Sequence, residues 1–445
     1  MNTSNRIHLP QNVENIIQNI EKAGYEAYAV GGCVRDSFLE KEPDDWDITT
    51  SATPEQIKEL FRRTVDTGIA HGTVTVMIHQ TGYEVTTYRV DGDYKDSRHP
   101  EEVFYTSSLT EDLKRRDFTI NAMAYNSKHG LVDVFGGMED LKKGVIRAVG
   151  DPEERFTEDA LRIMRAVRFS AQLGYTIEEK TKDALKKLAG NLEHISVERI
   201  QTELNKLLLS SHPEKMKVLF DCGITKVIMP EFDRIMETEQ NNPHHKYSVG
   251  DHTIKALQNV GADKVLRLTM LFHDFGKPLV QTEDADGIHH FHGHARISEQ
   301  LAVEILQRLK YDNDTIRRVR NLVRYHDLKI EMTHAGTRRA IYKVGEDMYP
   351  LLFEVQMADL SAQSEYKREE KINRLERMKE LYREVQKAND CVSLKTLAVS
   401  GKDVLEWGVK PGKEVGEVLA RLLDAVMDHP DWNDREVLYQ YWKTM

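Results

Sequence analysis

The segments Gly31-Gly32-Cys33-Val34-Arg35-Asp36 and Asp45-Trp46-Asp47-Ile48-Thr49-Thr50 decide the fold of this chain. The apolar run at 28–30 predicts a strand, and residues 34–40 after the two glycines predict the start of a helix. Glycines at such a turn let backbone N–H groups approach a phosphate without a Cβ in the way. The first segment therefore predicts a strand, a tight turn and a helix that together can bind phosphate.

The second segment carries two carboxylates, Asp45 and Asp47, which leave the same face of an extended chain. Hard oxygen ligands this close together are what a pair of Mg²⁺ ions needs when it also holds a triphosphate. Ordinary acidic turns contain the same Asp-x-Asp pattern, so a third carboxylate matters. Residues 73–78 alternate apolar and polar side chains, and Glu84 begins the next predicted strand, at 84–89. Three carboxylates converging from neighbouring strands suit two-metal phosphoryl transfer.

The composition is that of an ordered protein with several domains. The 445 residues are 40% hydrophobic and 30% charged, which is enough for about three domains with proper cores. The net charge of −11 argues against general nucleic-acid binding, although a binding face needs only a local excess of Arg and Lys. The three cysteines are far apart, so we expect no disulfide framework. Without a signal peptide or a long apolar run, we expect a soluble cytoplasmic protein without membrane contact.

Six motifs, in order along the chain, resemble one known family. They are GGCVRD at 31–36, DWDITT at 45–50, EVTTYR at 84–89, RRDFTINAMAYN at 115–126, EDALRIMRAVRF at 158–169 and SVERIQTEL at 196–204. Together they resemble the class II CCA-adding tRNA nucleotidyltransferases and the bacterial poly(A) polymerases, and a later stretch resembles the family members with an HD domain. The resemblance implies a nucleotidyltransferase head in which Asp45, Asp47 and Glu84 are catalytic.

Charged residues in the later motifs are candidates for nucleotide binding. Arg116 can meet a phosphate with two N–H groups and Asp117 can accept from a ribose hydroxyl, although a salt-bridged helix start explains the same pattern. The resemblance favours sugar and phosphate recognition. We therefore expect nucleotide binding by Gly31, Gly32, Arg35, Arg116, Asp117, Asn121, Asp159, Arg162, Arg165 and Arg168.

Asp159 and Arg162 have the chemistry to select the base. A helix is predicted over 157–171 with both residues on its polar side, where plain surface ion pairs are the alternative. Cytosine and adenine each present an amino donor beside a ring-nitrogen acceptor, whereas uracil and guanine present the reverse. Because Asp159 only accepts and Arg162 only donates, the pair complements C and A. The resembling family assigns the same role to the matching residues, and we expect Glu198 and Arg199 to hold this helix in place.

Residues 91–114 are polar and turn-rich, which is typical of a surface excursion or of a functional loop. The resemblance implies the latter, a flexible loop that lets an enzyme proceed from C to A addition. A chain that has this loop is not expected to add C alone.

Histidines are concentrated in the second half, where nine of the eighteen fall between 244 and 326. Imidazole with carboxylate suits a divalent transition metal. By resemblance to HD phosphohydrolase domains we expect the ligands His252, His273, Asp274 and Asp327, with His326 as a fifth candidate. A helical RNA-binding body that keeps the remnant of such a site is the alternative.

The prediction is an α+β protein with a nucleotidyltransferase head and all-α parts after it. The expected domains are a head with a mixed or antiparallel sheet at 1–150, a helical neck at 151–243, an HD metal-binding body at 244–345 and a helical tail at 346–445. Glycine and lysine turns at 400–403 and 410–413 open helices in the tail, either as caps or as phosphate contacts.

The expected activity is addition of CCA, from CTP and ATP with Mg²⁺, to the 3′ end of tRNA, without a template. An A-adding enzyme or poly(A) polymerase would share every head motif. A phosphohydrolase of nucleotides or 2′,3′-cyclic phosphates that uses the body as its principal site is a second alternative, and a noncatalytic RNA-binding protein is a third. The sequence does not indicate an oligomeric state.

Overall fold

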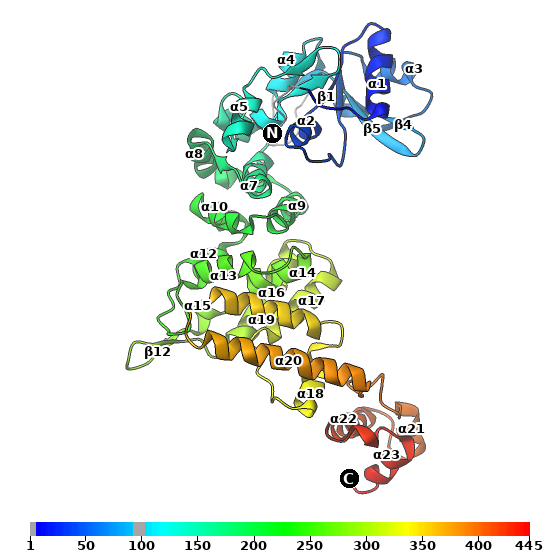
Figure 1. Cartoon of the computed structure of the whole chain (residues 1–445), viewed down its shortest axis with the longest axis vertical. Coiled ribbons are helices and arrows are strands. Elements are labelled where there is room, and N and C mark those ends of the chain that lie inside the picture. The colour runs from blue at the N-terminus through cyan, green and yellow to red at the C-terminus, as the bar shows by residue number, and fades with distance from the viewer. Residues whose placement is uncertain (1–5, 92–102) are drawn as a thin grey trace. The chain divides into compact units, whose positions relative to one another are not determined.

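The computed structural model describes residues 6–91 and 103–445. The chain divides into two compact units, Met1–Pro230 and Glu231–Met445, blue to green and green to red in Figure 1. Among the described residues, no helix is long and apolar enough to cross a bilayer.

A seven-stranded mixed sheet organises the first unit, in the order β3-β4-β5-β2-β1-β8-β9. Its strands are β1 (Ala27–Val30), β2 (Ile48–Thr50), β3 (Thr64–Gly68), β4 (Thr73–Ile78), β5 (Thr81–Thr87), β8 (Ala124–Asn126) and β9 (Gly130–Val132). Only β2 and β5 pair in parallel, and every other neighbouring pair is antiparallel. With the helices around it, this sheet confirms the predicted α+β class.

Apolar spacing and capping explain the helices that cover the sheet. In α1 (Gln11–Lys22) the apolar side chains Val13, Ile16, Ile17 and Ile20 are all buried. Helix α3 (Pro54–Leu60) begins at a capping box between Thr53 and Gln56, with Pro54 at its first position, as Thr-Pro at a helix start predicts. Helix α2 (Gly32–Phe38) begins directly after Gly31.

The segment expected as one long loop, 91–114, is partly regular. Strands β6 (Arg89–Asp91) and β7 (Val103–Tyr105) form a two-stranded ladder, and helix α4 spans Leu109–Lys114 with its N-terminus capped by Ser108. The middle of the expected loop, 92–102, lies outside the described residues. Both ends of the expected loop therefore belong to defined elements.

The rest of the first unit is largely helical. It contains α5 (Gly137–Lys143), β10 (Val145–Ile146), α6 (Pro152–Glu158), α7 (Leu161–Leu173), β11 (Thr176–Ile177), α8 (Glu179–Leu188), α9 (Val197–Leu208), α10 (Met216–Asp221) and α11 (Thr225–Ile228). The single helix expected over 157–171 is wrong. The helix is interrupted at Asp159, where the backbone is extended (φ −136°, ψ 102°) and the carboxylate accepts from the N–H of Leu161.

The second unit begins with packed helices. They are α12 (Pro230–Met236, whose first residue ends the first unit), α13 (Val249–Gln258), α14 (Lys264–Phe272), α15 (Lys277–Val280), α16 (His294–Arg308), α17 (Asn313–Tyr325), α18 (His334–Val344) and α19 (Tyr349–Ala362). Between α15 and α16 a short ribbon pairs β12 (Thr282–Glu283) with β13 (His289–His290). Helices α13 and α16 carry His252 and His294, and His273 and His326 directly follow α14 and α17.

The chain ends in a long helix and a small helical cluster. Helix α20 (Arg368–Ala388) is followed by α21 (Gly401–Glu406), α22 (Lys413–Asp428) and α23 (Arg435–Trp442). Ser400 and Asp403 form a capping box at α21, which explains the turn at 400–403 as a cap. The apolar side of α22, with Leu422, Leu423 and Val426, packs into the core of the tail.

Candidate functional site

A glycine turn opens the candidate site in the head. Gly31 has φ 85° and ψ −130°, a conformation that residues with a Cβ rarely adopt. A Cβ there would lie 3.2 Å from Nη1 of Arg116. The turn thus places the first N–H groups of α2, which have no partner within the helix, close to a guanidinium.

The sheet places Asp47 and Glu84 side by side. Ile48 pairs with Val85 in the parallel ladder of β2 and β5, so the preceding residues, Asp47 and Glu84, are neighbours, and Asp45 lies two residues upstream. All three residues are exposed. Partial loss of hydration raises the pKa of Asp47, and the charges of Glu84 and Asp45 raise it further, against the opposing effect of Arg116.

The three carboxylates interact but do not form a tight group. Among the described residues, the sets of three ligand atoms that lie within 4.8 Å of one another are in the second unit, and these carboxylates are not one of the sets. Three like charges repel one another at short range, which favours a wider spacing. Glu84 also lies within β5 and not at its start, and it pairs with Thr75 of β4.

Asp112 is a buried carboxylate that the sequence reasoning missed. It accepts from the hydroxyl of Thr49 at 3.0 Å, from Nε of Arg115 at 2.9 Å and from Nη2 of Arg116 at 3.4 Å. Burial raises the pKa of Asp112, but the charges of Arg116 and Arg115 outweigh burial, so the net pKa lies below the usual value. Asp112 thereby aims Arg116 toward the glycine turn. The spacing of an acid three and four residues before two arginines was the signal for it.

Asp117 connects the head to the neck. Its Oδ1 accepts from Nδ2 of Asn121 at 3.2 Å and its Oδ2 from Nε of Arg165 at 2.8 Å. Burial opposes ionisation, but the cation of Arg165 and these hydrogen bonds lower the pKa of Asp117 to about 2. Asp117 is therefore a fixed anion between α7 and the segment that follows α4.

Arg35, Arg165 and Arg168 surround the ring of Phe169. Their guanidinium carbons lie 5.1, 5.4 and 3.6 Å from its centroid. Arg35 also donates to Asp36 and, at 2.6 Å, to Oδ1 of Asn121. Arg168 donates to Glu203 of α9 at 2.8 Å. These three cations, expected to bind nucleotide, are held by groups of the protein and join α2, α7 and α9.

Asp159 and Arg162 do not face each other as neighbours on one helix. Oδ2 of Asp159 accepts from Nη2 of Arg199 at 3.1 Å. Arg162 donates to Glu158 at 2.7 Å and to the backbone carbonyl of Arg115 at 3.0 Å. Both side chains are anchored at the break between α6 and α7, and the contact of Arg199 agrees with the positioning role expected for it.

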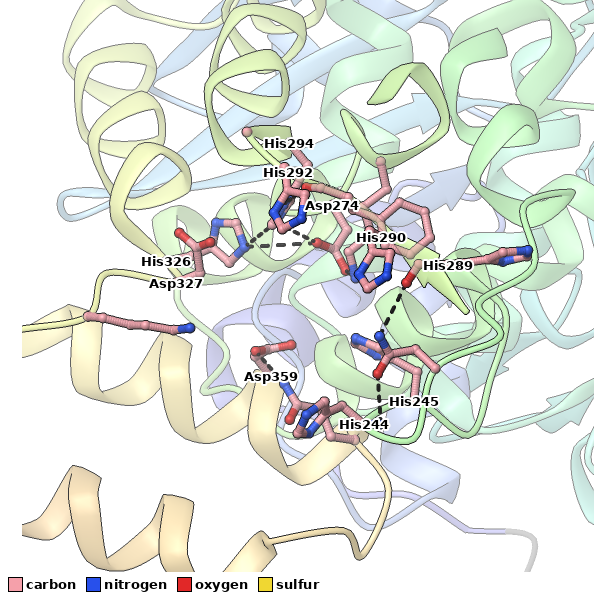
Figure 2. A pocket seen from close by; sticks show the side chains of 16 residues that line it. His244, His245, Asp274, His289, His290, His292, His294, His326, Asp327 and Asp359 are labelled. Atoms are coloured by element: carbon pink, nitrogen blue, oxygen red, sulfur yellow. Dashed lines mark hydrogen bonds and ion pairs between the residues drawn. The ribbon is translucent and has the colours of Figure 1, made fainter. Parts of the chain in front are cut away.

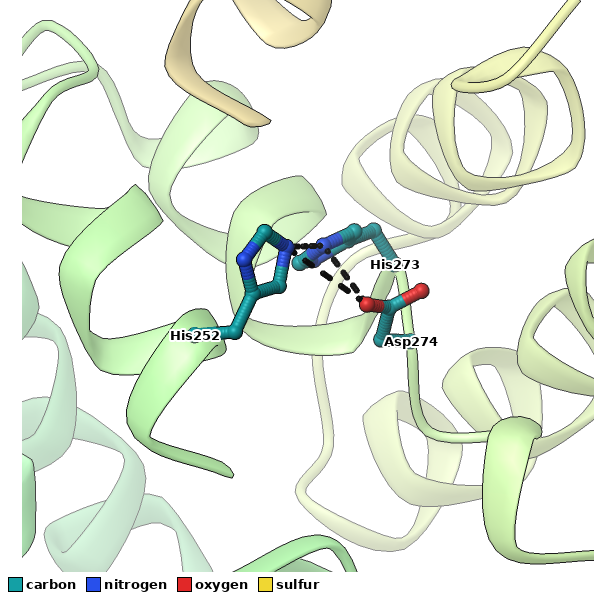
Figure 3. A group of neighbouring side chains, drawn as sticks. All are labelled: His252, His273 and Asp274. Carbon is teal, nitrogen blue, oxygen red and sulfur yellow. Dashed lines mark hydrogen bonds and ion pairs between the residues drawn. The ribbon is translucent and has the colours of Figure 1, made fainter. Parts of the chain in front are cut away.

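A second site lies in the second unit, around Asp274 (Figure 3). His252 comes from α13, and His273 and Asp274 follow directly on α14. Nε2 of His273 is 3.2 Å from Oδ2 of Asp274 and 3.3 Å from Nε2 of His252. Asp359 of α19 closes the group, with Oδ1 at 2.8 Å from Nε2 of His252.

Backbone carbonyls fix the orientation of both imidazoles. Nδ1 of His252 faces the carbonyl of Ala362 at 3.3 Å, and Nδ1 of His273 faces that of Met270 at 2.7 Å. A carbonyl only accepts, so each Nδ1 carries the hydrogen and each Nε2 presents a lone pair. Two lone pairs at 3.3 Å require a proton or a cation between them. Without a metal, Asp274 and Asp359 outweigh burial and raise the pKa of His273 to about 10, so a proton can take this place. The set of two imidazoles and two carboxylates also fits a divalent transition metal, which would replace that proton.

Asp327, the expected fourth ligand, is not part of this group. It is exposed and lines a cavity of about 540 Å³ (Figure 2). Asp359 occupies the position in this group that was expected for Asp327, and the sequence did not lead us to predict it. The available signal was a carboxylate between Ala358 and Leu360 on a helix that is otherwise mostly apolar, because such an acid is costly to bury without a cation. His326, the fifth candidate, lies on the other side of Asp274.

Three family models match successive parts of the chain. Residues 27–147 match the poly A polymerase head domain. Residues 174–236 match the probable RNA and SrmB-binding site of polymerase A, and residues 281–441 match tRNA nucleotidyltransferase domain 2, described as putative. Fold, carboxylates and models together define a nucleotidyltransferase with a poly(A) polymerase head.

Relatives of matching length identify the family. The CCA-adding enzyme of Levilactobacillus brevis is 38% identical over 93% of this chain and 94% of its own length. That of Ligilactobacillus salivarius is 36% identical over 97% and 95%. A crystal structure of the Bacillus stearothermophilus CCA-adding enzyme in complex with CTP has a TM-score of 0.70 and 28% identity, and the match covers 97% of this chain and 96% of that one. This chain belongs to the CCA-adding enzyme family.

Proposed function

We propose that this chain adds C, C and A in turn to the 3′ end of tRNA, taking the nucleotides from CTP and ATP. The observation that carries the proposal is the match over nearly the whole chain to CCA-adding enzymes. The arrangement of Asp47 and Glu84 on adjacent strands beside the glycine turn supports it, because the chemistry needs carboxylates and phosphate-binding groups at one place.

Divalent metal use follows from the nucleotidyltransferase family, and Mg²⁺ suits the hard carboxylate oxygens of Asp45 and Asp47. The residues fit such a group. The pKa of Asp47 is raised by burial and, in addition, by its two acidic neighbours. Nε of Arg116 is buried without a hydrogen-bond partner. Asp47 is therefore suited to a cation and Arg116 to a phosphate. Bound Mg²⁺ would neutralise charge on the attacking and leaving oxygens of the triphosphate.

The protein groups have distinct roles in this proposal. Glu84 orients the 3′ hydroxyl of the RNA toward the α-phosphate. The N–H groups after Gly31, with Arg116, bind the triphosphate, and Asp112 keeps Arg116 in place. Pyrophosphate leaves as the new phosphodiester forms, so a covalent enzyme intermediate is not required.

Base choice is assigned to Asp159 and Arg162. Their donor and acceptor chemistry complements C and A. Arg199 and Glu158 hold both side chains at the break between α6 and α7, so the two groups that would contact the base come from one short segment.

Nucleotide addition by the purified chain tests the proposal. Transcripts that end at the discriminator base or in CC are incubated with Mg²⁺ and labelled CTP or ATP, each alone and together. We expect CTP to extend the first substrate and ATP the second. Incorporation of ATP alone would indicate an A-adding enzyme or poly(A) polymerase instead. Asp47→Asn should abolish both additions, whereas Asp44→Asn, a neighbouring exposed acid, is the matched control.

A second function is supported by the buried group in the second unit. We infer that His252, His273, Asp274 and Asp359 bind one divalent transition metal and that this HD-type site hydrolyses phosphate esters. Metal analysis of His273→Ala against the parent tests the site, and phosphatase and cyclic phosphodiesterase assays test the activity. Unchanged metal content in His273→Ala would contradict the inference.

A further inference from the structure

A groove along α16 and α17 of the second unit is lined by arginines. It consists of two adjoining hollows, of about 410 and 400 Å³, that share Arg296, Glu299 and Arg320. The first hollow is also lined by Arg317, Asn321, Arg324 and Tyr325, and the second by Gln300, Val303 and Glu304. A different set of residues lines the cavity beside Asp274. The groove is therefore a separate feature, which neither the head chemistry nor the buried histidines explain.

Helical spacing explains why these arginines lie together. Helix α17 buries one apolar face, made of Ile316, Val319, Leu322 and Val323. Arg317, Arg320 and Arg324 are three and four residues apart, a spacing that places side chains on one face of a helix. Between the first and the last of them the helix rises roughly 10 Å. Arg296 joins them from α16, which packs against α17.

One glutamate holds two of the arginines in place. Glu299 accepts from Nε of Arg320 at 2.7 Å, and its other carboxylate oxygen lies 3.5 Å from Nε of Arg324. The side chain of Glu299 is only 15% exposed, whereas that of Arg320 is 61% exposed. A single carboxylate carries one negative charge, so it orients both guanidinium groups but neutralises only one of them.

The other two arginines of the groove are weakly compensated. Arg317 pairs with Asp314 at 2.8 Å, both side chains are more than half exposed, and the charge of Asp347 also acts on Arg317. Exposed ion pairs of this kind contribute little energy. Within the described part of the chain, Arg296 has no ion-pair partner. With four arginines against Glu299, the first hollow carries a formal excess of three positive charges, in a chain whose net charge is −11.

A row of phosphates is the ligand that this lining suits. The guanidinium fork matches two oxygens of one phosphate. The arginines of α17 extend over roughly 10 Å of helix, which is more than a single phosphate group occupies, so successive phosphates of one backbone can be contacted. Tyr325 is the one aromatic residue that lines the two hollows. Such a lining offers little for stacking bases, but contacts to phosphates need none.

We propose that the groove along α16 and α17 binds backbone phosphates of the tRNA substrate, through residues that take no part in nucleotide transfer. The proposal rests on the proposed function, which supplies the RNA, and it names a surface by which an acidic chain holds it. Arg296, Arg317, Arg320 and Arg324 donate to phosphate oxygens. Such contacts position an RNA without reading its sequence, which suits an enzyme that accepts many different tRNAs.

Binding of a labelled tRNA transcript to the full chain, followed by fluorescence anisotropy between about 50 and 200 mM salt, tests the proposal. The double variant Arg296→Gln, Arg317→Gln removes two groove cations but leaves both partners of Glu299. The matched control, Arg318→Gln, Lys310→Gln, removes equal charge from residues that line neither hollow. We expect the groove variant to bind at least about tenfold more weakly at low salt and to lose about two from the slope of log affinity against log salt. The control should bind like the parent.

Replacement of the same two arginines by lysine keeps the charges and should keep the salt slope of the parent. Unchanged tRNA affinity in the groove variant, an equal loss in the control, or weaker binding with an unchanged salt slope would each overturn the proposal.

Two further measurements separate the alternatives. Calorimetric titration with inorganic tripolyphosphate tests for a free anion. Loss of tripolyphosphate binding in the groove variant, with unchanged tRNA affinity, would assign the groove to a free anion and overturn the proposal. A parent protein that binds tRNA through the groove but adds no nucleotide would contradict the proposed function and support the groove. Circular dichroism of each variant checks that it is folded.

Discussion

Asp47 is the residue on which the head chemistry most depends, because it is the carboxylate that interacts with Asp45, Glu84 and Arg116 together. In the proposed site, Asp47→Asn would remove an anionic metal ligand worth several kcal/mol in the transition state. We expect kcat for both CTP and ATP addition to fall at least about a hundredfold. Single-turnover addition to a tRNA transcript measures it, and a rate for Asp47→Asn equal to that of Asp44→Asn would contradict the assignment.

Asp159 is expected to act on base choice and not on the rate of chemistry. Asp159→Ala removes an acceptor for the amino group shared by C and A, and a polar contact of this kind is worth about 1–3 kcal/mol. The preference for CTP over UTP in kcat/KM should therefore fall at least about fivefold.

Arg199→Ala, which removes only the partner that holds Asp159 at 3.1 Å, should shift the preference in the same direction by a smaller factor. Arg199→Lys should restore part of it, as expected for a positioning residue. Full retention of preference in Asp159→Ala would end the base-reading hypothesis.

At the scale of elements, the turn before α2 depends on its glycine. Gly31→Ala would strain the backbone by about 1–3 kcal/mol and press its Cβ toward Arg116. We expect KM for CTP and ATP to rise together with the loss of stability. Gly24→Ala is the matched control, because Gly24 also has a positive φ but open space around its Cβ position. Equal effects of the two substitutions on KM would show that the approach of Arg116 is unimportant.

The connection between α7 and the head should depend on pH through Asp117. The pKa of Asp117 is lowered from 3.8 to about 2 in the folded chain. Its ionised form therefore stabilises the fold fully when the pH is above the pKa of the unfolded chain, and this stabilisation is lost as the pH falls toward 2. The size is about 2 kcal/mol near neutral pH and about half of that near pH 3.

Urea unfolding of the parent and of Asp117→Asn measures this contribution. The difference in free energy of unfolding should shrink between about pH 6 and about pH 3. A difference that stays constant over this range would contradict the ion pair with Arg165 as its source. Asp44→Asn serves as the control for a general charge effect.

At the scale of the whole molecule, a chain with a net charge of −11 that acts on tRNA, as proposed, would contact it through a local excess of basic side chains. Contacts to phosphates release counterions, so their affinity falls as salt rises. Between about 50 and 200 mM salt we expect KM for tRNA to rise at least about tenfold. KM for CTP, measured in the same assay, should change much less. Parallel changes in both would indicate that phosphate contacts to tRNA are not the main source of affinity.

The sequence predicted the head well because local patterns agree there with the fold. Alternating residues in 73–78, the glycine turn and the Thr-Pro helix start each specify their element without help from distant residues. The prediction of one helix over 157–171 failed because the carboxylate of Asp159 accepts from the N–H of Leu161, and its partner Arg199 lies forty residues away. Asp112 and Asp359 were missed since a buried acid is recognised by what surrounds it, and those neighbours come from other elements.

The sequence by itself determined the family, the α+β class, the acidic and glycine motifs of the head and the concentration of histidines in the second half. Only the tertiary structure decided which charges meet. In the folded chain, Arg35, Arg165 and Arg168 contact other groups of the protein. Asp359, and not Asp327, lies beside His252. The two oxygens of Asp274 face different histidine pairs. A motif specifies residue types and their separation along the sequence. Which charges pair depends on the distances between side chains of different helices in the folded chain, and the separation along the sequence does not determine these distances.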